Sequence, residues 1–305
     1  MPIEMHNALS LSQDVVDREV IHPEDRAALQ SLRELPAFDT LVKALMKNFT
    51  EETIRGTSLA QKIRLGPNQL SDVYNLLPPI CRQLDIKEPE LYLEMNPFPN
   101  AYTIGDTRTF VTITSGLLES LETEEIQAVL AHECGHIRCR HCLYHTVAVA
   151  IKGIAKSALP IPAIAWTPVE SALYAWSRAS ELSADRIAAI SVGYAKPVIN
   201  TMIRLSGGSK AITARINVDE YMKQVKDYTL LRTRDEVSDL LQTFATALRT
   251  HPFPAIRVKE IIAWCNNAKF RRFAKAVGSV RCTKCGTVLK STDLFCSNKK
   301  CGLPV

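Results

Sequence analysis

The sequence predicts an α+β protein that is mainly helical and carries a small antiparallel sheet. Apolar residues make up 46% of the 305 residues and charged residues 23%, so the chain can bury a sizeable core. Aromatic residues make up only 7%, and Gly and Pro are not enriched, which disfavours strand-rich folds with many tight turns. Helical spacing of apolar residues dominates, whereas strict alternation is confined to one stretch. The length predicts one large domain with a small appendage.

The first 120 residues predict helices followed by short strands. His22-Pro23-Glu24-Asp25 is typical of a helix start, and helical spacing continues from there to about Phe49. A second helical region spans residues 67–84 and is interrupted at Pro78-Pro79. A turn cluster at 96–100 then separates segments in which apolar residues alternate. The antiparallel strands are expected at residues 91–95, 101–104 and 110–113.

The rest of the chain predicts further helices and a terminal appendage. A long helix begins at Thr123, with two acidic residues in its first turn. Thr167-Pro168-Val169-Glu170 has the form of a capping box and predicts a helix that runs to about Ile190. Other helices are expected at 197–205, 235–248 and 255–274. The expected units are an N-terminal helical region at 1–65, a main domain at 66–277 and a cysteine-rich appendage at 278–305.

A metal site is predicted by His132-Glu133-Cys134-Gly135-His136 inside the helix that begins at Thr123. At ~100° per residue the two histidines lie about 40° apart on one helix face, where both imidazoles can bind one Zn²⁺. Glu133 is offset by ~100° and can accept a proton from a water on that metal rather than bind it. The alternative, two core histidines, is disfavoured because the whole HExxH pattern rarely arises by chance.

Glu181 is the expected third metal ligand. A catalytic zinc takes three protein ligands and keeps one open position, so two histidines are one ligand short. Glu181 and Asp185 lie one turn apart on a predicted helix and share a face. We expect Glu181 to bind the metal and Asp185 to accept a hydrogen bond from His132. Taken alone, this spacing is also typical of a solvated helix face, and the upstream motif decides against that interpretation.

Four cysteines near the C-terminus predict a second, structural zinc. Cys282, Cys285, Cys296 and Cys301 form two pairs, each followed by Gly, in a segment too short to fold around an apolar core. The pattern resembles a zinc ribbon, with short strands at 287–289 and 294–295. A Cys₄ set closes all four positions around the metal, so this site is expected to stabilise or recruit and not to catalyse.

A third metal site near the HExxH motif is not expected. Cys134, Cys139, Cys142, His141 and His145 follow closely, but a continuous helix would place His141 near 180° and Cys142 near −80° from His132. Cys139 would point along the metal face, where a small buried residue is the expected role. Cys81 and Cys265 are expected in the core.

The motifs together resemble the HtpX-like and CAAX prenyl endopeptidase family of zinc metallopeptidases, which belongs to the gluzincins. The matches span residues 70–265 and include Asn100-Ala-Tyr-Thr-Ile-Gly105, Thr114-Ser-Gly-Leu-Leu118, the HExxH helix with Arg140-His141, Glu181 to Asp185, and Thr250-His251-Pro252 with Arg257. The resemblance implies a substrate-binding strand at Asn100, Ala101 and Tyr102. It also implies that His251 stabilises the oxyanion and that Arg257 supports the site. Without the resemblance, a lone His before Pro is more often a helix-start or packing residue.

The function expected from these residues is zinc-dependent hydrolysis of peptide bonds in protein or peptide substrates, with one catalytic and one structural Zn²⁺. The alternative is a non-proteolytic or latent scaffold, with the site inactive or occluded by residues 1–65. Retention of Glu133 argues against it, because a structural zinc needs no base.

Charge and hydropathy give expectations about partners and location. Residues 251–305 hold eleven basic and two acidic residues, whereas the rest holds 26 and 30. The basic ribbon can therefore bind a protein partner or an anionic membrane surface, and a solvated basic face without a partner is an equal alternative. Nucleic acid is disfavoured, since aromatic stacking residues are few. No secretory signal or transmembrane run is visible, and residues 143–166 are expected to pack on the body rather than touch a membrane. The nine cysteines favour a reducing compartment, and a cytoplasmic protein, peripherally attached at most, is expected.

Overall fold

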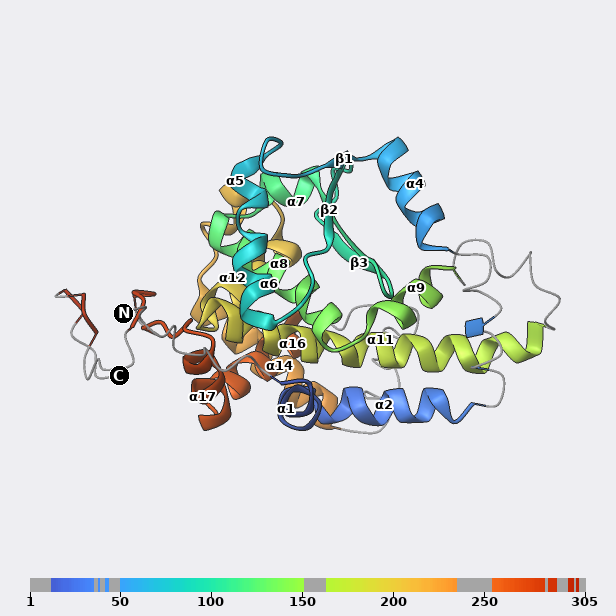
Figure 1. The fold of residues 1–305 in the computed structure, drawn as a ribbon. Coiled ribbons are helices and arrows are strands. Elements are labelled where there is room, and N and C mark those ends of the chain that lie inside the picture. Colours follow the sequence, from blue (N-terminus) through green and yellow to red (C-terminus); the bar gives the residue numbers. More distant parts are fainter. Residues whose placement is uncertain are drawn as a thin grey trace, which may run out of the picture.

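The fold is that of a computed structural model. It describes residues 12–35, 38, 42–43, 50–150, 163–234, 254–282, 285–289, 296–298 and 300–301. Helices form the body and one four-stranded sheet packs at its side (Figure 1). The predicted α+β class with a helical majority is confirmed.

The sheet is mixed and not purely antiparallel, which corrects the prediction. Its strands are β1 (Ile63–Arg64), β2 (Glu90–Glu94), β3 (Ala101–Gly105) and β4 (Thr109–Thr114), in the order β1-β2-β4-β3. The β3–β4 hairpin is antiparallel, but β4 rather than β3 lies beside β2, and these two strands are parallel. Alternation predicted where the strands lie, but it carries no information on which strands are neighbours. This order leaves β3 at the edge of the sheet.

The N-terminal region begins with α1 (Gln13–Val15), the π-helical turn η1 (Val16–Val20) and α2 (Pro23–Arg33). The predicted start of α2 is confirmed, since the His22 side chain accepts a hydrogen bond from the Glu24 amide. The helix ends at Arg33, well before the expected Phe49. A further helix, α4 (Glu51–Gln61), follows and was not predicted.

Two short helices, α5 (Ser71–Tyr74) and α6 (Leu77–Leu84), replace the predicted region at 67–84. The break comes before the prolines rather than at them. Pro78 lies in the first turn of α6, where the missing N–H would have no partner in the helix. After the sheet, α7 (Ser115–Ser120) leads into the longest helices of the body.

The two central helices are α8 (Thr123–Arg138) and α11 (Ala163–Val192), with α9 (Cys142–Ala150) between them in sequence. The predicted start of α8 is confirmed, and a capping box between Glu122 and Glu125 fixes it. The predicted start of α11 at Thr167 is wrong, because helix precedes it and Pro168 lies inside. The helix therefore continues through Pro168, although this residue has no N–H to donate to the preceding turn.

The C-terminal body contains α12 (Lys196–Gly207), α13 (Lys210–Thr213), α14 (Val218–Arg234), α16 (Pro254–Cys265) and α17 (Ala268–Ala276). The helix predicted at 255–274 is divided, because the Asn267 side chain accepts from the Lys269 amide and starts α17. The helix predicted at 197–205 is confirmed and α14 was not predicted. The helix predicted at 235–248 lies outside the described residues.

Close packing of α8 on α11 positions the predicted metal ligands. A Cβ atom built on Gly135 would lie 3.1 Å from the Cα and carbonyl oxygen of Ala184 and from Cβ of Ile187. Gly135 therefore lets the two helices approach closely at the centre of the HExxH motif. On the other side of α11, α2 runs alongside it, as Figure 1 shows along the lower edge of the body.

Cys81, Cys134, Cys139 and Cys142 are buried, as expected for packing residues, whereas Cys265 is half-buried. In α9, Val147 and Ala148 pack against Leu32 of α2 and Trp176 of α11. This agrees with the expected packing of that segment on the body, although residues 151–162 lie outside the described part. No helix among the described residues has the length and apolar character needed to cross a membrane.

Candidate metal centre

His132 and His136 lie one turn apart on α8 and both are buried. Their Nε2 atoms are 3.2 Å apart and the two rings meet edge to face. The shared helix face that was predicted from the i, i+4 spacing is thus the observed arrangement. Two imidazole nitrogens at this separation can bind one metal ion.

Glu181 reaches the two histidines from α11. Its Oε2 lies 3.3 Å from Nε2 of His132 and its Oε1 lies 3.4 Å from Nε2 of His136. A tetrahedral zinc with bonds of about 2.0 to 2.2 Å holds its ligand atoms roughly 3.3 to 3.6 Å apart. The three donors therefore fit zinc without rearrangement, and the structure brings together the three residues that the sequence singled out as ligands.

Asp185 and Arg257 surround these ligands. Nδ1 of His132 and Oδ1 of Asp185 are 3.0 Å apart, as predicted. Nε and Nη2 of Arg257 each donate to Asp185 over 2.7 Å, and Nη1 lies 3.1 Å from Oε2 of Glu181. A planar guanidinium suits such paired contacts. Arg257 thus holds both carboxylates in place from α16.

The charges of this cluster shift the pKa values of its members. Burial disfavours charge on His132, but the carboxylates of Glu181 and Asp185 outweigh it and raise the pKa of His132 to about 10. Burial raises the pKa of Asp185, but Arg257 and His132 outweigh it and lower that pKa below its ordinary value. The pKa of His136 is lowered, chiefly by burial. Two buried carboxylates thus favour positive charge at His132, which suits a divalent cation.

Glu133 is held by Thr103, which sequence reasoning missed. The Thr103 hydroxyl, from β3, donates to Oε2 of Glu133 over 2.6 Å, and both residues are buried. The signal was a polar residue inside an alternating strand directly beside the predicted substrate segment. This bond fixes the carboxylate of Glu133 between the edge strand and the ligand helix.

The predicted substrate residues Asn100, Ala101 and Tyr102 fall at the start of β3, but their backbones face different ways. The Asn100 carbonyl accepts from the Thr114 amide, which assigns alternate residues of β3 to the ladder with β4. Ala101 and Thr103 therefore direct their backbone groups to the open edge. The Tyr102 hydroxyl donates to Glu94 over 2.6 Å.

A second histidine cluster corrects the expectation that the residues after the motif diverge. Ring nitrogens of His136, His141 and His145 lie within 4.8 Å of one another. The angular argument assumed a continuous helix, whereas α8 ends at Arg138 and Arg140 takes a positive φ of 61°. That turn brings His141 back toward His136. Cys139 and Cys142 are buried but do not belong to this cluster.

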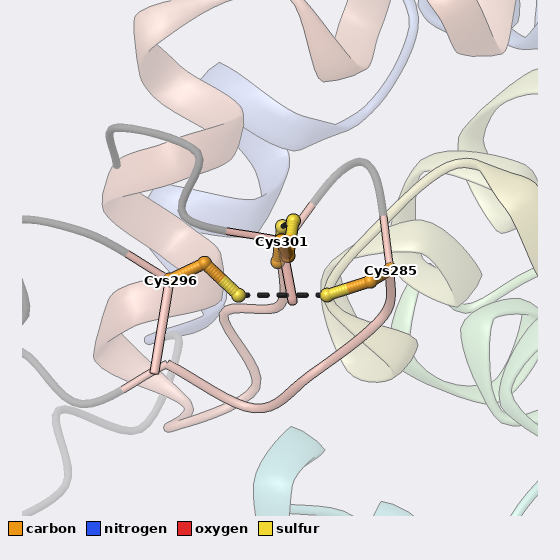
Figure 2. Close-up of side chains that lie close together, drawn as sticks. Cys285, Cys296 and Cys301 are labelled. Atoms are coloured by element: carbon orange, nitrogen blue, oxygen red, sulfur yellow. Dashed lines mark hydrogen bonds between the residues drawn. The ribbon is translucent and has the colours of Figure 1, made fainter. Parts of the chain in front are cut away.

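The four C-terminal cysteines converge as predicted. Their sulfurs lie within 4.8 Å of one another, with Cys282 and Cys301 at 3.7 Å and Cys285 and Cys296 at 3.4 Å. Figure 2 shows the sulfurs of Cys285 and Cys296 pointing toward each other beside Cys301. Tetrahedral zinc with ~2.3 Å bonds to sulfur spaces its ligands by about 3.8 Å, so the donor set suits this metal.

Hydrogen bonds shape the first half of this cysteine cluster. The Gly286 amide donates to the Cys282 carbonyl, and Gly286 takes a φ of 71°, which favours glycine. Hydrogen bonds from the hydroxyl and amide of Thr287 lower the pKa of Cys285 to about 6, which favours the thiolate that binds metal. Of the predicted ribbon strands, 287–289 forms a single bridge, Arg281 to Val288, and 294–295 lies outside the described residues.

His251 also lies outside the described residues, so its predicted oxyanion role stays a prediction. The other predicted site residues all fall in the described part of the chain.

Comparison with known proteins shows which proteins the chain resembles. The model of peptidase family M48 matches residues 69–265. Plastoglobule-localized metallopeptidase 48, chloroplastic, of Arabidopsis thaliana is 31% identical over 271 residues, which cover 87% of this chain and 77% of that protein. Protease HtpX homolog 2 of Methanosarcina mazei is 22% identical over 196 residues, 56% of this chain and 66% of that protein.

Among solved structures, the crystal structure of S. mikatae Ste24p aligns with 77% of this chain at 17% identity and a TM-score of 0.38. The chain spans 62% of that protein. The family model covers more than half of the chain, and the Arabidopsis relative is matched over most of its length. The resemblance inferred from the motifs is confirmed: the chain belongs to peptidase family M48, a family of zinc-dependent proteases.

Proposed function

We propose that the chain is a zinc endopeptidase in which His132, His136 and Glu181 hold the catalytic metal and Glu133 is the general base. The observation that carries this is the convergence of three donors from two helices at separations that suit one zinc. Glu133, which is not one of the three donors, lies on the same helix as the two histidines and is held by Thr103. A purely structural site would need no such residue as Glu133.

Zn²⁺ at this site would lower the pKa of a bound water and polarise a peptide carbonyl. Glu133 accepts the proton of the attacking water and then donates it to the leaving amine. Thr103 occupies Oε2 of Glu133, so Oε1 is the oxygen that carries the proton. His251 is proposed to help stabilise the oxyanion.

The open edge of β3 is proposed to bind substrate as an added strand. An extended peptide can pair with the backbone groups of Ala101 and Thr103, which face away from β4. The Gly105 end is already occupied, because the Thr146 hydroxyl accepts a hydrogen bond from the Gly105 amide. Substrate is therefore expected to pair along the Asn100 end of the strand. Backbone pairing makes protein or peptide substrates the class that this edge fits.

The cysteine cluster is proposed to bind a second, structural zinc within a C-terminal unit at 278–305. The main unit is proposed at 66–277, after an N-terminal region at 1–65. The Arg281 guanidinium lies over the Tyr194 ring, which places the start of the C-terminal unit against the segment after α11. Partner or surface recruitment through this basic unit remains part of the proposal, as does a reducing, cytoplasm-like environment. The plastoglobule location in the name of the Arabidopsis relative supports peripheral attachment to a lipid surface.

The deciding experiment measures metal content and cleavage of a fluorogenic peptide library by wild type and by Glu133→Gln. Two zinc ions per chain are expected in both proteins, because Glu133 binds no metal. Cleavage is expected to fall by about 10² to 10⁴-fold in Glu133→Gln, the usual contribution of general acid–base catalysis. Chelation should abolish cleavage by wild type, and added zinc should restore it.

Glu124→Gln is a matched control on the same helix, since Glu124 is exposed and bonded to Tyr194 rather than to the site. Its activity should stay close to that of wild type. Bound zinc with equal, undetectable cleavage in wild type and Glu133→Gln would favour the scaffold alternative. Loss of all zinc on removal of residues 278–305 would refute the site on α8 and α11.

A further inference from the structure

We propose that Asp25 of α2 is a positioning residue for the metal ligand His136 and acts through His141. The proposal rests on the proposed zinc site and adds two residues to it. Asp25 precedes the region that the M48 model matches, and neither Asp25 nor His141 belongs to the three-ligand set. The inference follows from a chain of buried side chains that ends on the ligand.

The contacts run from α2 through the turn after α8 to the metal ligand. Nδ1 of His136 lies 3.1 Å from Nδ1 of His141, and Nε2 of His141 lies 3.0 Å from Oδ2 of Asp25. Asp25 and His141 are each 1% exposed, so water does not compete for these contacts. The His136 ring is thus held at Nδ1 by His141, and the His141 ring is held at Nε2 by Asp25.

The positions of the protons in this chain are fixed once His136 binds metal. An imidazole that binds through Nε2 carries its proton on Nδ1, which must be donated. The atom facing it is Nδ1 of His141, which must therefore accept, so the proton of His141 lies on Nε2. That proton points at Oδ2 of Asp25, an acceptor. A carboxylate at the end of the chain can accept the Nε2 proton of His141. A hydrogen-bond donor at the same place could not.

The two metal-binding imidazoles are thereby supported in parallel ways. His132 is bonded directly to Asp185, whereas His136 is bonded to Asp25 through one intervening ring. Such partners fix the tautomer and orientation of a ligand histidine and increase its basicity. The chain links Nδ1 of His136 to the carboxylate of Asp25, as Asp185 is linked to Nδ1 of His132.

Asp25 is itself held rigidly enough to act in this way. Trp176 Nε1 donates to its Oδ1 over 3.0 Å, and the Ser183 hydroxyl donates to its Oδ2 over 2.6 Å. The Ser183 hydroxyl also accepts from the His22 amide at the start of α2. Both partners lie on α11, the helix that carries Glu181. The position of the Asp25 carboxylate is therefore fixed by the same helix that carries the proposed ligand Glu181.

A second metal at His136, His141 and His145 is the competing interpretation of the same cluster. It would require His136 to bind metal through both nitrogens and would replace the hydrogen bond between Nδ1 of His136 and Nδ1 of His141. His145 Nε2 lies 3.2 Å from the Ser180 hydroxyl, which already engages that ring. The hydrogen-bonded chain gives both nitrogens of His141 a partner without a second ion.

Asp25→Asn tests the proposal with little change of shape. Trp176 at Oδ1 can only donate, whereas the Ser183 hydroxyl at Oδ2 can turn to accept. The amide oxygen is therefore expected to face Trp176 and the amide NH₂ to face His141. His141 would then carry its proton on Nδ1 and force the proton of His136 onto Nε2, the metal-binding atom. Affinity for metal at this site is expected to fall about 10- to 100-fold, as for other outer partners of ligand histidines.

The measurement is a Co²⁺ titration of the full chain, followed by competition with Zn²⁺. A His₂Glu site gives weak visible bands, whereas cobalt bound by four thiolates gives strong near-ultraviolet charge-transfer bands, so the two sites are read separately. Glu24→Gln is the matched control, because it removes one exposed carboxylate from the same helix. Its affinity at both sites should equal that of wild type.

Trp176→Phe separates positioning from packing, since it removes the hydrogen bond from Trp176 to Asp25 but leaves His141 and Ser183 bonded. The proposal predicts a much smaller loss of Co²⁺ affinity than in Asp25→Asn, and an equal loss would overturn it. In a His141→Ala background, Asp25→Asn should have no further effect. Should Asp25→Asn fail to fold, His141→Leu must show the same 10- to 100-fold loss, and unchanged affinity would overturn the proposal.

Two other outcomes distinguish the failure of this proposal from the failure of the proposed zinc site on which it rests. Wild type with no cobalt bound at the His₂Glu site would sink the proposed function together with this inference. Equal Co²⁺ affinity of wild type and Asp25→Asn at the His₂Glu site would refute this inference alone. A third equivalent of Co²⁺, lost in His145→Ala, would establish the second-metal interpretation instead.

Discussion

The Thr103 hydroxyl donates to the carboxylate of Glu133 over 2.6 Å, and this contact joins the edge strand β3 to the helix that carries both histidine ligands. A peptide paired with β3, as proposed, would lie against the same strand that orients Glu133, the proposed general base. The position of the substrate and the position of Glu133 are therefore set by one element. Since Thr103 is buried, the bond is not shared with bulk water.

Thr103→Val should lower kcat/KM by about 10- to 150-fold while zinc content stays the same. The change keeps the shape of the side chain and removes a hydrogen bond to a charged group, which contributes about 1.5 to 3 kcal/mol. Steady-state cleavage of a fluorogenic peptide measures the loss. Thr103→Ser keeps the hydroxyl and should recover most of the activity. Wild-type rates in Thr103→Val would show that Glu133 needs no such support.

Arg257→Gln should destabilise the metal-free protein by about 3 to 5 kcal/mol, because it leaves the buried carboxylates of Asp185 and Glu181 without their cation. Urea unfolding with and without zinc measures this, and zinc should recover part of the loss by binding Glu181. Arg257→Lys keeps the charge but not the paired hydrogen bonds, so an intermediate loss is expected. Equal stability of Arg257→Lys and wild type would show that the paired geometry is unimportant.

Cys285→Ser should remove one of the two zinc ions and leave Glu133-dependent cleavage of small peptides in place. The thiolate of Cys285 is favoured at neutral pH, since its pKa is lowered to about 6, so its loss breaks a ready ligand set. Metal analysis and peptide cleavage on the same preparation measure both effects. Cys265→Ser is the control, because Cys265 lies outside the cluster and should leave two zinc ions bound.

Asp25 should make stability depend on pH in the acid range. Burial raises its pKa, but the charge and hydrogen bond of His141 and the bonds from Ser183 and Trp176 outweigh this and lower the pKa below its ordinary value. The folded state therefore binds this proton more weakly than the unfolded chain, whose Asp pKa is about 3.9. The contribution is present above that value and is lost as the pH falls through the folded pKa.

Urea unfolding of metal-free protein between about pH 6 and pH 3 measures this dependence. The free energy of unfolding of wild type should fall more steeply with acid than that of Asp25→Asn, since other carboxylates titrate in both proteins. Parallel curves would contradict the assignment of a lowered pKa to Asp25. Glu24→Gln should retain the wild-type slope.

Much of the metal centre was readable from the sequence because its parts obey local rules. Residues four apart on a helix share a face wherever the helix packs, so His132 with His136 and Glu181 with Asp185 were paired by spacing alone. The short sequence spacings of Cys282 to Cys285 and of Cys296 to Cys301, and the alternation within each strand, are local in the same sense. The identity of Arg257 as a supporting residue came from the family resemblance.

Tertiary structure decided what spacing cannot express. The sequence determined the helical majority, the strand positions, the His132–His136 and Glu181–Asp185 pairs and the cysteine pairs, since each depends on residues close together in the chain. Only the fold decided that β4 lies between β2 and β3, that Thr103 meets Glu133, and that Asp25 reaches His136 through a turn at Arg140. Asp25 looked like an ordinary acidic residue at a helix start. Its partner, His141, lies 116 positions away along the chain. The two residues meet, and are buried, only because α2, α8 and α11 pack together.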